Sequence, residues 1–176
     1  MPWWVRVPGL CILLTLSACG KVVQTEGGSG KTLCFDYYQR CVNRVFDDTL
    51  TYGGISASNC SSSGCHQAGV GPGGAFKINP GLPLLVLTTP AQDRTTQMYA
   101  NFLSAKGSTN LNDPRQSFLI KKPLGEVFHG GGLIFPDATV IGVREFQFWA
   151  SQNVDDEFGA QCPSLFNPPA STTCQF

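Results

Sequence analysis

The sequence is poor in charge and, beyond its N-terminus, has no long apolar run. Only 14% of its 176 residues are charged, and 12 basic side chains balance 12 acidic ones. A protein that binds nucleic acid through a basic surface is therefore not expected. No segment after the first twenty residues is long and apolar enough to cross a bilayer as a helix. The length leaves room for one modest domain.

Glycine, proline and cysteine are plentiful by contrast. The chain has 20 glycines and 12 prolines, which favour a loop-rich fold over long regular helices. Eight cysteines in so short a chain are unusual for a reduced cytosolic protein. We expect a small, mainly α-helical domain with long Gly/Pro-rich loops and structural disulfides.

The N-terminus indicates export. Arg6 precedes the short apolar run Leu10–Leu16, which is typical of a cleaved signal peptide. The segment Leu16–Gly20 then resembles a bacterial lipobox, which implies a signal peptide over residues 1–18 and a lipid on Cys19. A plain signal peptide without lipid is the alternative. Gly20 resembles the sorting pattern for the outer membrane. The resemblance implies a lipoprotein of the cell envelope, held by acyl chains at the outer membrane and facing the periplasm or the cell surface.

The mature chain divides into a tether and one domain. Residues 19–32 are polar and Gly-rich, as in a flexible tether. Residues 33–176 would form the domain, with a cysteine-containing, loop-like tail from about residue 155. Apolar spacing predicts a helix over Leu33–Leu50, an amphipathic helix over Thr95–Leu103 and a closing helix over Thr139–Val154. Asp137 or Thr139 is the expected cap of the last.

One short motif carries the most chemical information. Cys60 and Cys65 are separated by four residues, and His66 follows directly. A pair of cysteines, the second followed directly by histidine, is typical of a motif for covalent haem c attachment. In such a motif the two thiols bond the haem vinyl groups, and the histidine becomes the proximal iron ligand. The usual spacing has two intervening residues. A local Cys60–Cys65 disulfide is the main alternative. Zinc would need four ligands in a chain with two histidines, and a Cys-His nucleophile pair is disfavoured between sequence neighbours.

Beyond this motif, the chain resembles a small monohaem cytochrome c domain over most of its mature length. The resemblance rests on a helix before the motif, the Gly/Pro-rich segment Gln67–Gly81 after it, the segment Asp113–Leu124 and the closing helix. It implies one covalently bound haem c, one-electron transfer and redox partner proteins of the envelope. No other Cys-His pair exists, so no second haem is expected.

The second axial ligand has three candidates. His129 lies where such proteins commonly carry a distal methionine, and three glycines follow it. It is the preferred distal ligand, because its ligation would explain one histidine in each half of the chain. Met98 is the rival ligand, although within a helix it more often fills a core. An open sixth position would instead indicate ligand or peroxide chemistry.

The aromatic residues are read most simply as core, and some of them would wall a haem if one is bound. They are Phe76, Phe118, Phe128, Phe135, Phe146 and Trp149.

Four cysteines remain for disulfides. On an unbroken helix, Cys34 and Cys41 would stand about 10.5 Å apart along the axis, too far for a bond. Two crossed arrangements then join them to Cys162 and Cys174. A local Cys162–Cys174 bond is possible only if the first helix is not straight.

The sequence thus predicts an envelope electron carrier. A haem-free, disulfide-stapled lipoprotein that serves as a structural or interaction module is the alternative, and a peroxidase-like haem enzyme is a weaker third.

Overall fold

The structure is a computed structural model that describes residues 30–47, 51–52, 55–56, 60–169 and 172–176. The predicted signal peptide, the lipidation site Cys19 and most of the tether lie outside these residues. Thr32, the last residue of the predicted tether, is buried and pairs with Val154 through two backbone hydrogen bonds of 2.9 Å. Within the described ranges, no helix has the length and apolar character that crossing a membrane requires.

The first helix is continuous but changes its winding in the middle. It consists of α1 (Phe35–Tyr37), a π-helical turn η1 (Tyr38–Val42) and α2 (Asn43–Asp47). Its start is fixed by the Cys34 Sγ, which accepts a hydrogen bond from the Tyr37 backbone N–H at 3.4 Å. The helix was predicted over Leu33–Leu50, and Leu33 in fact precedes it. The predicted inner face is correct, since Leu33, Tyr37, Cys41 and Val45 are all buried.

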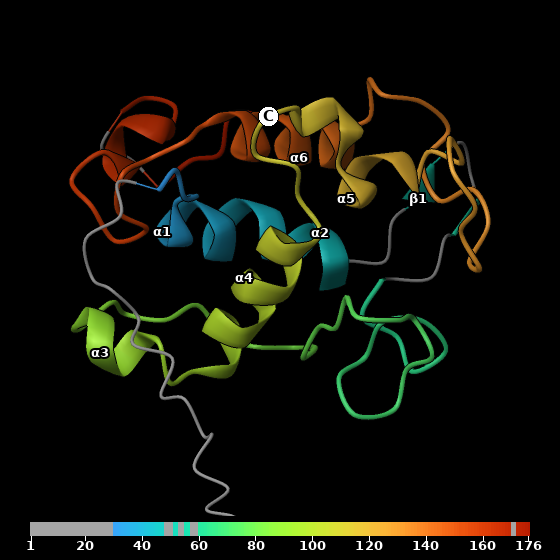
Figure 1. The fold of residues 1–176 in the computed structure, drawn as a ribbon, viewed down its shortest axis with the longest axis horizontal. Helices are drawn as coiled ribbons and strands as arrows, with labels where there is room; N and C mark the ends of the chain where they lie inside the picture. The colour runs from blue at the N-terminus through green and yellow to red at the C-terminus, as the bar shows by residue number, and fades with distance from the viewer. Residues whose placement is uncertain (1–29, 48–50, 53–54, 57–59, 170–171) are drawn as a thin grey trace, which may run out of the picture.

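The last long helix, α6 (Ile141–Ser151), packs antiparallel against the first (Figure 1). Phe146 stacks on Phe46 with 5.0 Å between ring centroids. Farther along, the Trp149 indole donates to the Cys34 carbonyl at 3.1 Å. The two helices approach closely at Gly142, where a Cβ would lie 2.7 Å from Val45 Cγ1. The contact between the two helices buries several large aromatic side chains, among them Tyr38, Phe46 and Trp149.

The capping prediction for this helix was wrong. Val140 is the N-cap residue and makes no side-chain capping bond. Asp137 instead accepts hydrogen bonds from the backbone N–H and the hydroxyl of Thr139, at 2.7 and 2.5 Å. The Asp137 carboxylate thus stabilises a local turn that precedes the helix, and it does not cap the helix itself.

A third long helix, α4 (Gln97–Gly107), crosses in front of this pair in Figure 1. Its N-cap Thr96 accepts a hydrogen bond from the Tyr99 backbone N–H at 3.1 Å. Phe102 is buried on its inner face, with its ring centroid 5.5 Å from that of Tyr38. The amphipathic helix predicted over Thr95–Leu103 therefore exists, displaced toward the C-terminus.

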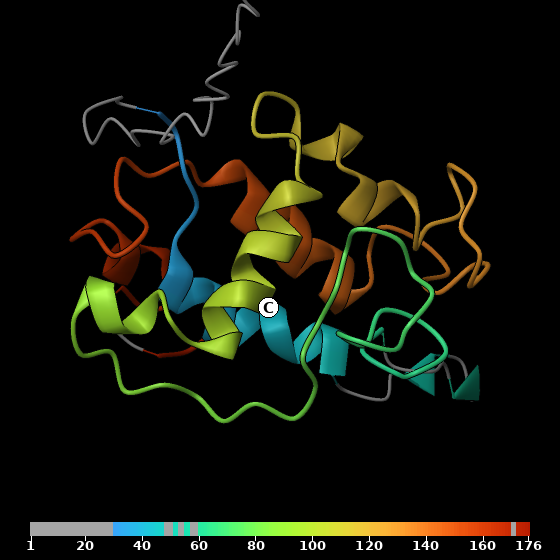
Figure 2. The ribbon, with the colours of Figure 1, turned by 60° about the horizontal axis from the view of Figure 1, so that its bottom comes forward.

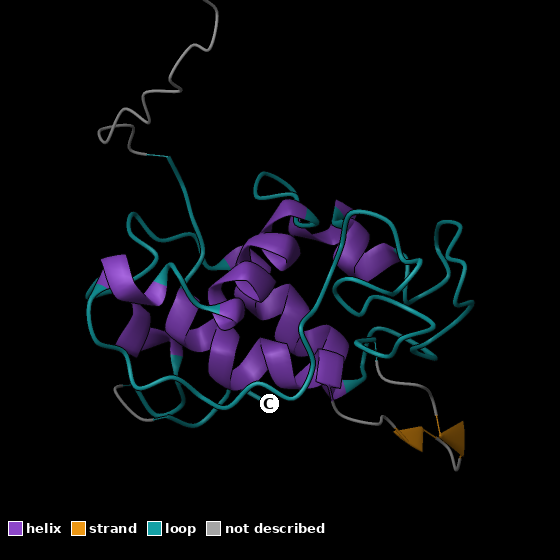
Figure 3. Cartoon of the chain, turned by 90° about the horizontal axis from the view of Figure 1, so that it is seen from below, coloured by secondary structure: helices purple, strands orange, loops and turns teal. Residues whose placement is uncertain are grey.

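The remaining elements are short, and loops join them, so the mainly helical fold class is confirmed. Figures 2 and 3 show the helices gathered in the middle with loops around them. The short elements are β1 (Thr51–Tyr52), antiparallel to β2 (Ile55–Ser56), α3 (Pro90–Asp93), η2 (Pro114–Gln116), α5 (Phe118–Lys121) and η3 (Cys162–Leu165).

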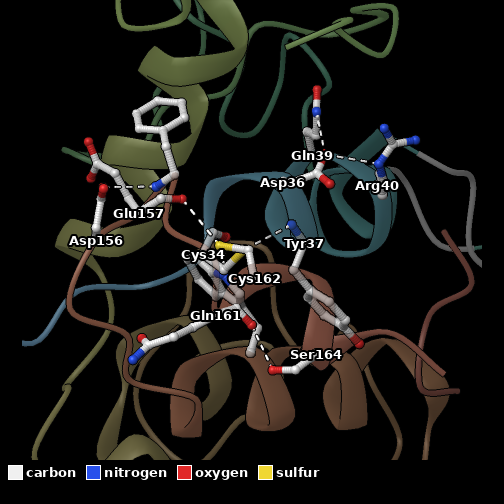
Figure 4. Close-up of a disulfide and its surroundings, with 12 residues drawn as sticks. Cys34, Asp36, Tyr37, Gln39, Arg40, Asp156, Glu157, Gln161, Cys162 and Ser164 are labelled. Atoms are coloured by element: carbon white, nitrogen blue, oxygen red, sulfur yellow. Dashed lines mark hydrogen bonds and ion pairs between the residues drawn. A yellow bond between two sulfur atoms is a disulfide. The ribbon is translucent and has the colours of Figure 1, made fainter. Parts of the chain in front are cut away.

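Two disulfides join the first helix to the tail. Cys34 bonds Cys162 and Cys41 bonds Cys174, which is one of the two crossed arrangements left open by the sequence. Figure 4 shows the first of these bonds beneath the start of the helix. The pairing closes covalent loops across 128 and 133 residues of sequence.

Candidate functional site

A cavity of about 460 Å³ lies beyond the C-terminal half of the first helix. Its size falls within the range of small-molecule and cofactor sites, roughly 300–1,000 Å³. Five parts of the chain meet there: α2, the loop that begins at Cys60, the C-terminal end of α4, α5 with its following loop, and α6. Its walls are mostly apolar and include Phe46, Phe76, Phe118, Leu119, Ile134 and Phe146.

Both cysteines of the sequence motif line this cavity, and neither forms a disulfide. Burial, with a smaller contribution from Cys65, raises the pKa of the Cys60 thiol to about 12. Cys60 therefore stays protonated at neutral pH, which argues against its use as a thiolate nucleophile. The motif places two half-buried thiols beside one apolar space.

His66 reaches the same cavity with a defined orientation. Its Nδ1 lies 2.9 Å from the Phe76 carbonyl oxygen, which can only accept, so Nδ1 carries the proton and donates. Burial lowers the pKa of the imidazole, and the neighbouring His129 adds to this effect. A neutral ring protonated at Nδ1 leaves the Nε2 lone pair available, as metal-ligating histidines require.

The loop around His66 holds the ring from several directions. The His66 backbone N–H donates to the Cys60 carbonyl at 2.9 Å, and the His66 carbonyl accepts from Ile78 at 2.8 Å. The Phe76 ring packs edge-on at 4.8 Å between centroids. Gly73 comes so close that a Cβ there would lie 2.3 Å from the imidazole Nδ1. Glycine is thus required at this position to let the loop close over the histidine.

His129 faces His66 from another part of the chain. The two ring centroids are 6.1 Å apart, and the ring planes differ by only 15°. The Nδ1 of His129 donates to the Gly132 carbonyl at 2.9 Å. Within the part of the chain that the structure describes, neither Nε2 has a hydrogen-bond partner. Residues 63 positions apart thus present matching lone-pair nitrogens at one cavity.

The rival ligand Met98 lies elsewhere. It is 1% exposed, belongs to the hydrophobic core on α4 and does not line the cavity. Its surroundings are those of a packing residue.

The aromatic predictions divide three ways. Phe76, Phe118 and Phe146 line the cavity, whereas Phe135 and Trp149 are core. The core prediction was wrong for Phe118, which is 59% exposed at the cavity, and for Phe128, which is 92% exposed. Neither belongs to a helical apolar stripe long enough to be buried, and a Gly-rich turn follows Phe128 at once.

Sequence reasoning missed several contributors to the site, among them Phe46 and Gly73. Phe46 was not singled out, although its position one turn before the end of the predicted helix could have placed it next to the loop that carries Cys60. Gly73 lies in a glycine-rich segment that showed no further signal. Both act through tertiary contacts, which a single sequence does not reveal.

No three His, Cys, Asp or Glu side chains of the described residues converge as a metal site. The donor set at the cavity is instead two facing imidazoles with two thiols nearby. Comparisons of the whole chain with protein-family models, with curated proteins and with solved structures found no match.

Proposed function

We propose that this protein is a c-type cytochrome of the bacterial envelope, which transfers single electrons through one covalently bound haem. One observation carries the proposal: His66 and His129 face each other across an apolar cavity that both unpaired cysteines of the motif also line. Haem ligation would account for the positions of both histidines of the chain at once. Without it, the presence of each histidine at the cavity would need its own explanation.

The spacing of the two rings fits a shared iron. Two imidazoles that held one iron between them through nitrogen, with bonds of about 2 Å, would have ring centroids up to about 6 Å apart. The rings here are 6.1 Å apart and nearly parallel. Both have Nδ1 engaged by a backbone carbonyl, so both would bind through Nε2.

The other residues of the cavity have roles that suit a macrocycle. Cys60 and Cys65 would form the thioether bonds, and His66 and His129 would be the axial ligands. Phe46, Phe76 and Phe146 supply apolar walls that exclude water from the iron. Bound haem supplies the one-electron chemistry, and the protein supplies ligation, burial and orientation.

Electron exchange with partner proteins needs an accessible edge. Phe118 and Leu133 line the cavity and are 59% and 64% exposed, so the cavity opens to the surface at these residues. Lys122 also lines it, with its ammonium 5.3 Å from the centroid of the Phe118 ring. An envelope redox protein would approach there.

Attachment to the membrane through a lipid on Cys19 remains part of the proposal. It rests on the sequence of the first twenty residues and is tested separately, by mass spectrometry of the mature N-terminal peptide. A diacylglyceryl-modified Cys19 is expected. Cleavage at another residue, with no lipid, would leave a periplasmic protein.

The central experiment is a pyridine haemochrome spectrum of protein exported to a periplasm that contains the haem c maturation machinery. A c-type spectrum is expected in the wild type and none in Cys60→Ala/Cys65→Ala. Electron paramagnetic resonance of the ferric protein then tests the ligands. His129→Ala should convert the low-spin signal to high-spin, whereas Met98→Leu should leave it unchanged.

A second candidate is a haem-free lipoprotein that serves as a structural or interaction module. The two disulfides that bind the first helix to the tail favour it to some extent, since they hold this part of the domain without any cofactor. It predicts a colourless, folded wild-type protein in the same experiment, with a Cys60–Cys65 disulfide detectable by mass spectrometry.

A further inference from the structure

The two histidines of the cavity are held very differently. His66 is fixed by its own backbone bonds to Cys60 and Ile78, by the Phe76 carbonyl and by close packing against Gly73. All of these partners belong to other parts of the loop. Moving His66 would require the loop from Cys60 to Ile78 to rearrange as a unit.

Among the described residues, the hydrogen bonds of His129 all lie within its own turn. Its Nδ1 donates to the Gly132 carbonyl, and the Gly132 backbone N–H donates back to the His129 carbonyl, both at 2.9 Å. In the described part of the chain, no residue from Val127 to Leu133 is buried, and Phe128 is almost fully exposed. The turn therefore carries its ligand without anchoring itself in the core.

The turn is joined to the domain by a narrow neck. The Pro123 carbonyl accepts hydrogen bonds from the backbone N–H groups of Ile134 and Phe135, at 2.8 and 3.0 Å. Phe135 is fully buried and marks where the neck enters the core. Of the residues that the structure describes, none between Glu126 and Ile134 belongs to the core, and the hydrogen bonds of this segment lie within it.

We propose, on the basis of the proposed haem site, that the His129 turn is a displaceable lid and that the site takes up a small neutral ligand of ferrous iron. His129 would leave the iron as the turn lifts away, which would open the cavity to the ligand, while His66, Cys60 and Cys65 would continue to hold the haem.

The cavity residues outside the His129 turn determine which class of ligand fits. Leu119, Ile134 and Phe118 give an apolar chamber, and Lys122 is the only formally charged side chain among the described residues that line it. A neutral diatomic molecule fits these walls, whereas an anion would lose its hydration with a single exposed lysine to replace it.

The test is carbon monoxide binding to the dithionite-reduced holoprotein, followed by stopped-flow absorbance. Wild-type binding should reach a limiting rate as the carbon monoxide concentration rises, because departure of His129 limits it. The His129→Ala variant should bind without a limiting rate and at least about tenfold more tightly, since no closed state competes. Met98→Leu is the matched control and should behave as the wild type.

Each other outcome is distinct. If only His129→Ala binds carbon monoxide, His129 is a fixed ligand and the lid proposal is wrong, while the cytochrome proposal stands. If wild type and His129→Ala bind identically, His129 does not hold the iron and the lid proposal is again wrong. If neither protein contains haem, the proposed function itself has failed.

Discussion

The two ends of the first helix differ in how completely their polar and reactive groups are used. At the N-terminal end, both cysteines are oxidised to disulfides and the buried Tyr37 hydroxyl donates to Glu145 at 2.6 Å. The other Glu145 oxygen accepts from the backbone N–H of Phe176 at 3.0 Å. At the C-terminal end, two thiols that form no disulfide border one cavity with two imidazoles, whose Nε2 atoms have no hydrogen-bond partner among the described residues.

This difference separates structural from functional chemistry. Buried polar groups in a finished structure find partners, because an unsatisfied one costs free energy. The disulfide end obeys this rule with protein groups alone. The cavity end leaves its imidazole Nε2 atoms open to a ligand of the cavity. The contrast agrees with the proposal that Cys34 and Cys41 are structural whereas Cys60 and Cys65 hold a cofactor.

The largest effect is expected from breaking the disulfide end. Cys41→Ala/Cys174→Ala removes a cross-link over 133 residues, which the chain-entropy model values at about 4–5 kcal/mol. Urea denaturation measures the loss, and the haem spectrum in the absence of urea should stay unchanged. Fully reduced wild type, which lacks both cross-links, should be less stable than the variant. Equal stability of variant and wild type would show that this bond does not stabilise the domain.

A smaller but more specific effect is expected at the cavity end. Gly73→Ala inserts a methyl group 2.3 Å from the His66 Nδ1, so we expect a loss of about 1–3 kcal/mol from overpacking. The ferric spectrum should also lose its low-spin character as His66 is displaced. Gly64→Ala is the control in the same loop, because no atom lies within 4 Å of a Cβ there. A normal spectrum in Gly73→Ala would mean that the loop yields without moving the histidine.

The third prediction concerns alkaline pH. Burial, followed by the hydrogen bond to Glu145, raises the pKa of Tyr37. The folded protein thus keeps this proton above pH 10, where the unfolded chain releases it, so stability falls as pH rises. Tyr37→Phe should lose about 1–3 kcal/mol at neutral pH. It should also flatten the decline above pH 10 by up to about 1.4 kcal/mol per pH unit.

Tyr99→Phe provides the comparison for this experiment. Burial, followed by its hydrogen bond to Glu157, raises the pKa of Tyr99 to about 12. Its contribution has the same sign and is confined to pH values between about 10 and 12. Unfolding curves from pH 8 to 11.5 measure both variants. A decline in Tyr37→Phe as steep as in the wild type would contradict the assignment.

The smallest effect is expected at the exposed rim of the cavity end. Phe128 is 92% exposed, so Phe128→Ser should change the free energy of unfolding by less than about 0.5 kcal/mol. Phe46→Ala is the contrasting variant, because that ring is buried between Phe76 and Phe146 and its loss should cost about 3–5 kcal/mol. A large loss in Phe128→Ser would show that the turn is anchored after all.

Local sequence pattern was enough to predict the long helices and the residues of the candidate site. The apolar spacing of the first and last helices located both to within a few residues, and the rise of a helix was enough to exclude a Cys34–Cys41 bond. The Cys-x4-Cys-His motif and the scarcity of histidine singled out the four side chains that line the cavity with free sulfur or nitrogen atoms. Whether they hold haem remains a prediction.

Features that depend on distant neighbours could not be predicted. The π-helical turn Tyr38–Val42, the cap at Val140 and the exposure of Phe128 each depend on how the loops pack around a helix. The choice between the two crossed disulfide arrangements also needed the folded chain. The sequence pattern predicts the helices and the candidate ligand residues, whereas tertiary contacts determine which side chains lie together.

The crossed disulfides also determine what a protease can achieve. They bond Cys34 and Cys41 to Cys162 and Cys174, so all of residues 42–161 lie within a closed covalent ring. A single cut in an exposed loop, such as the segment from Pro80 to Thr89, opens the ring but leaves both fragments bonded to each other. Cleavage must occur twice before any piece of the cavity end can leave the molecule. A nicked copy would therefore keep its parts together and could retain its site.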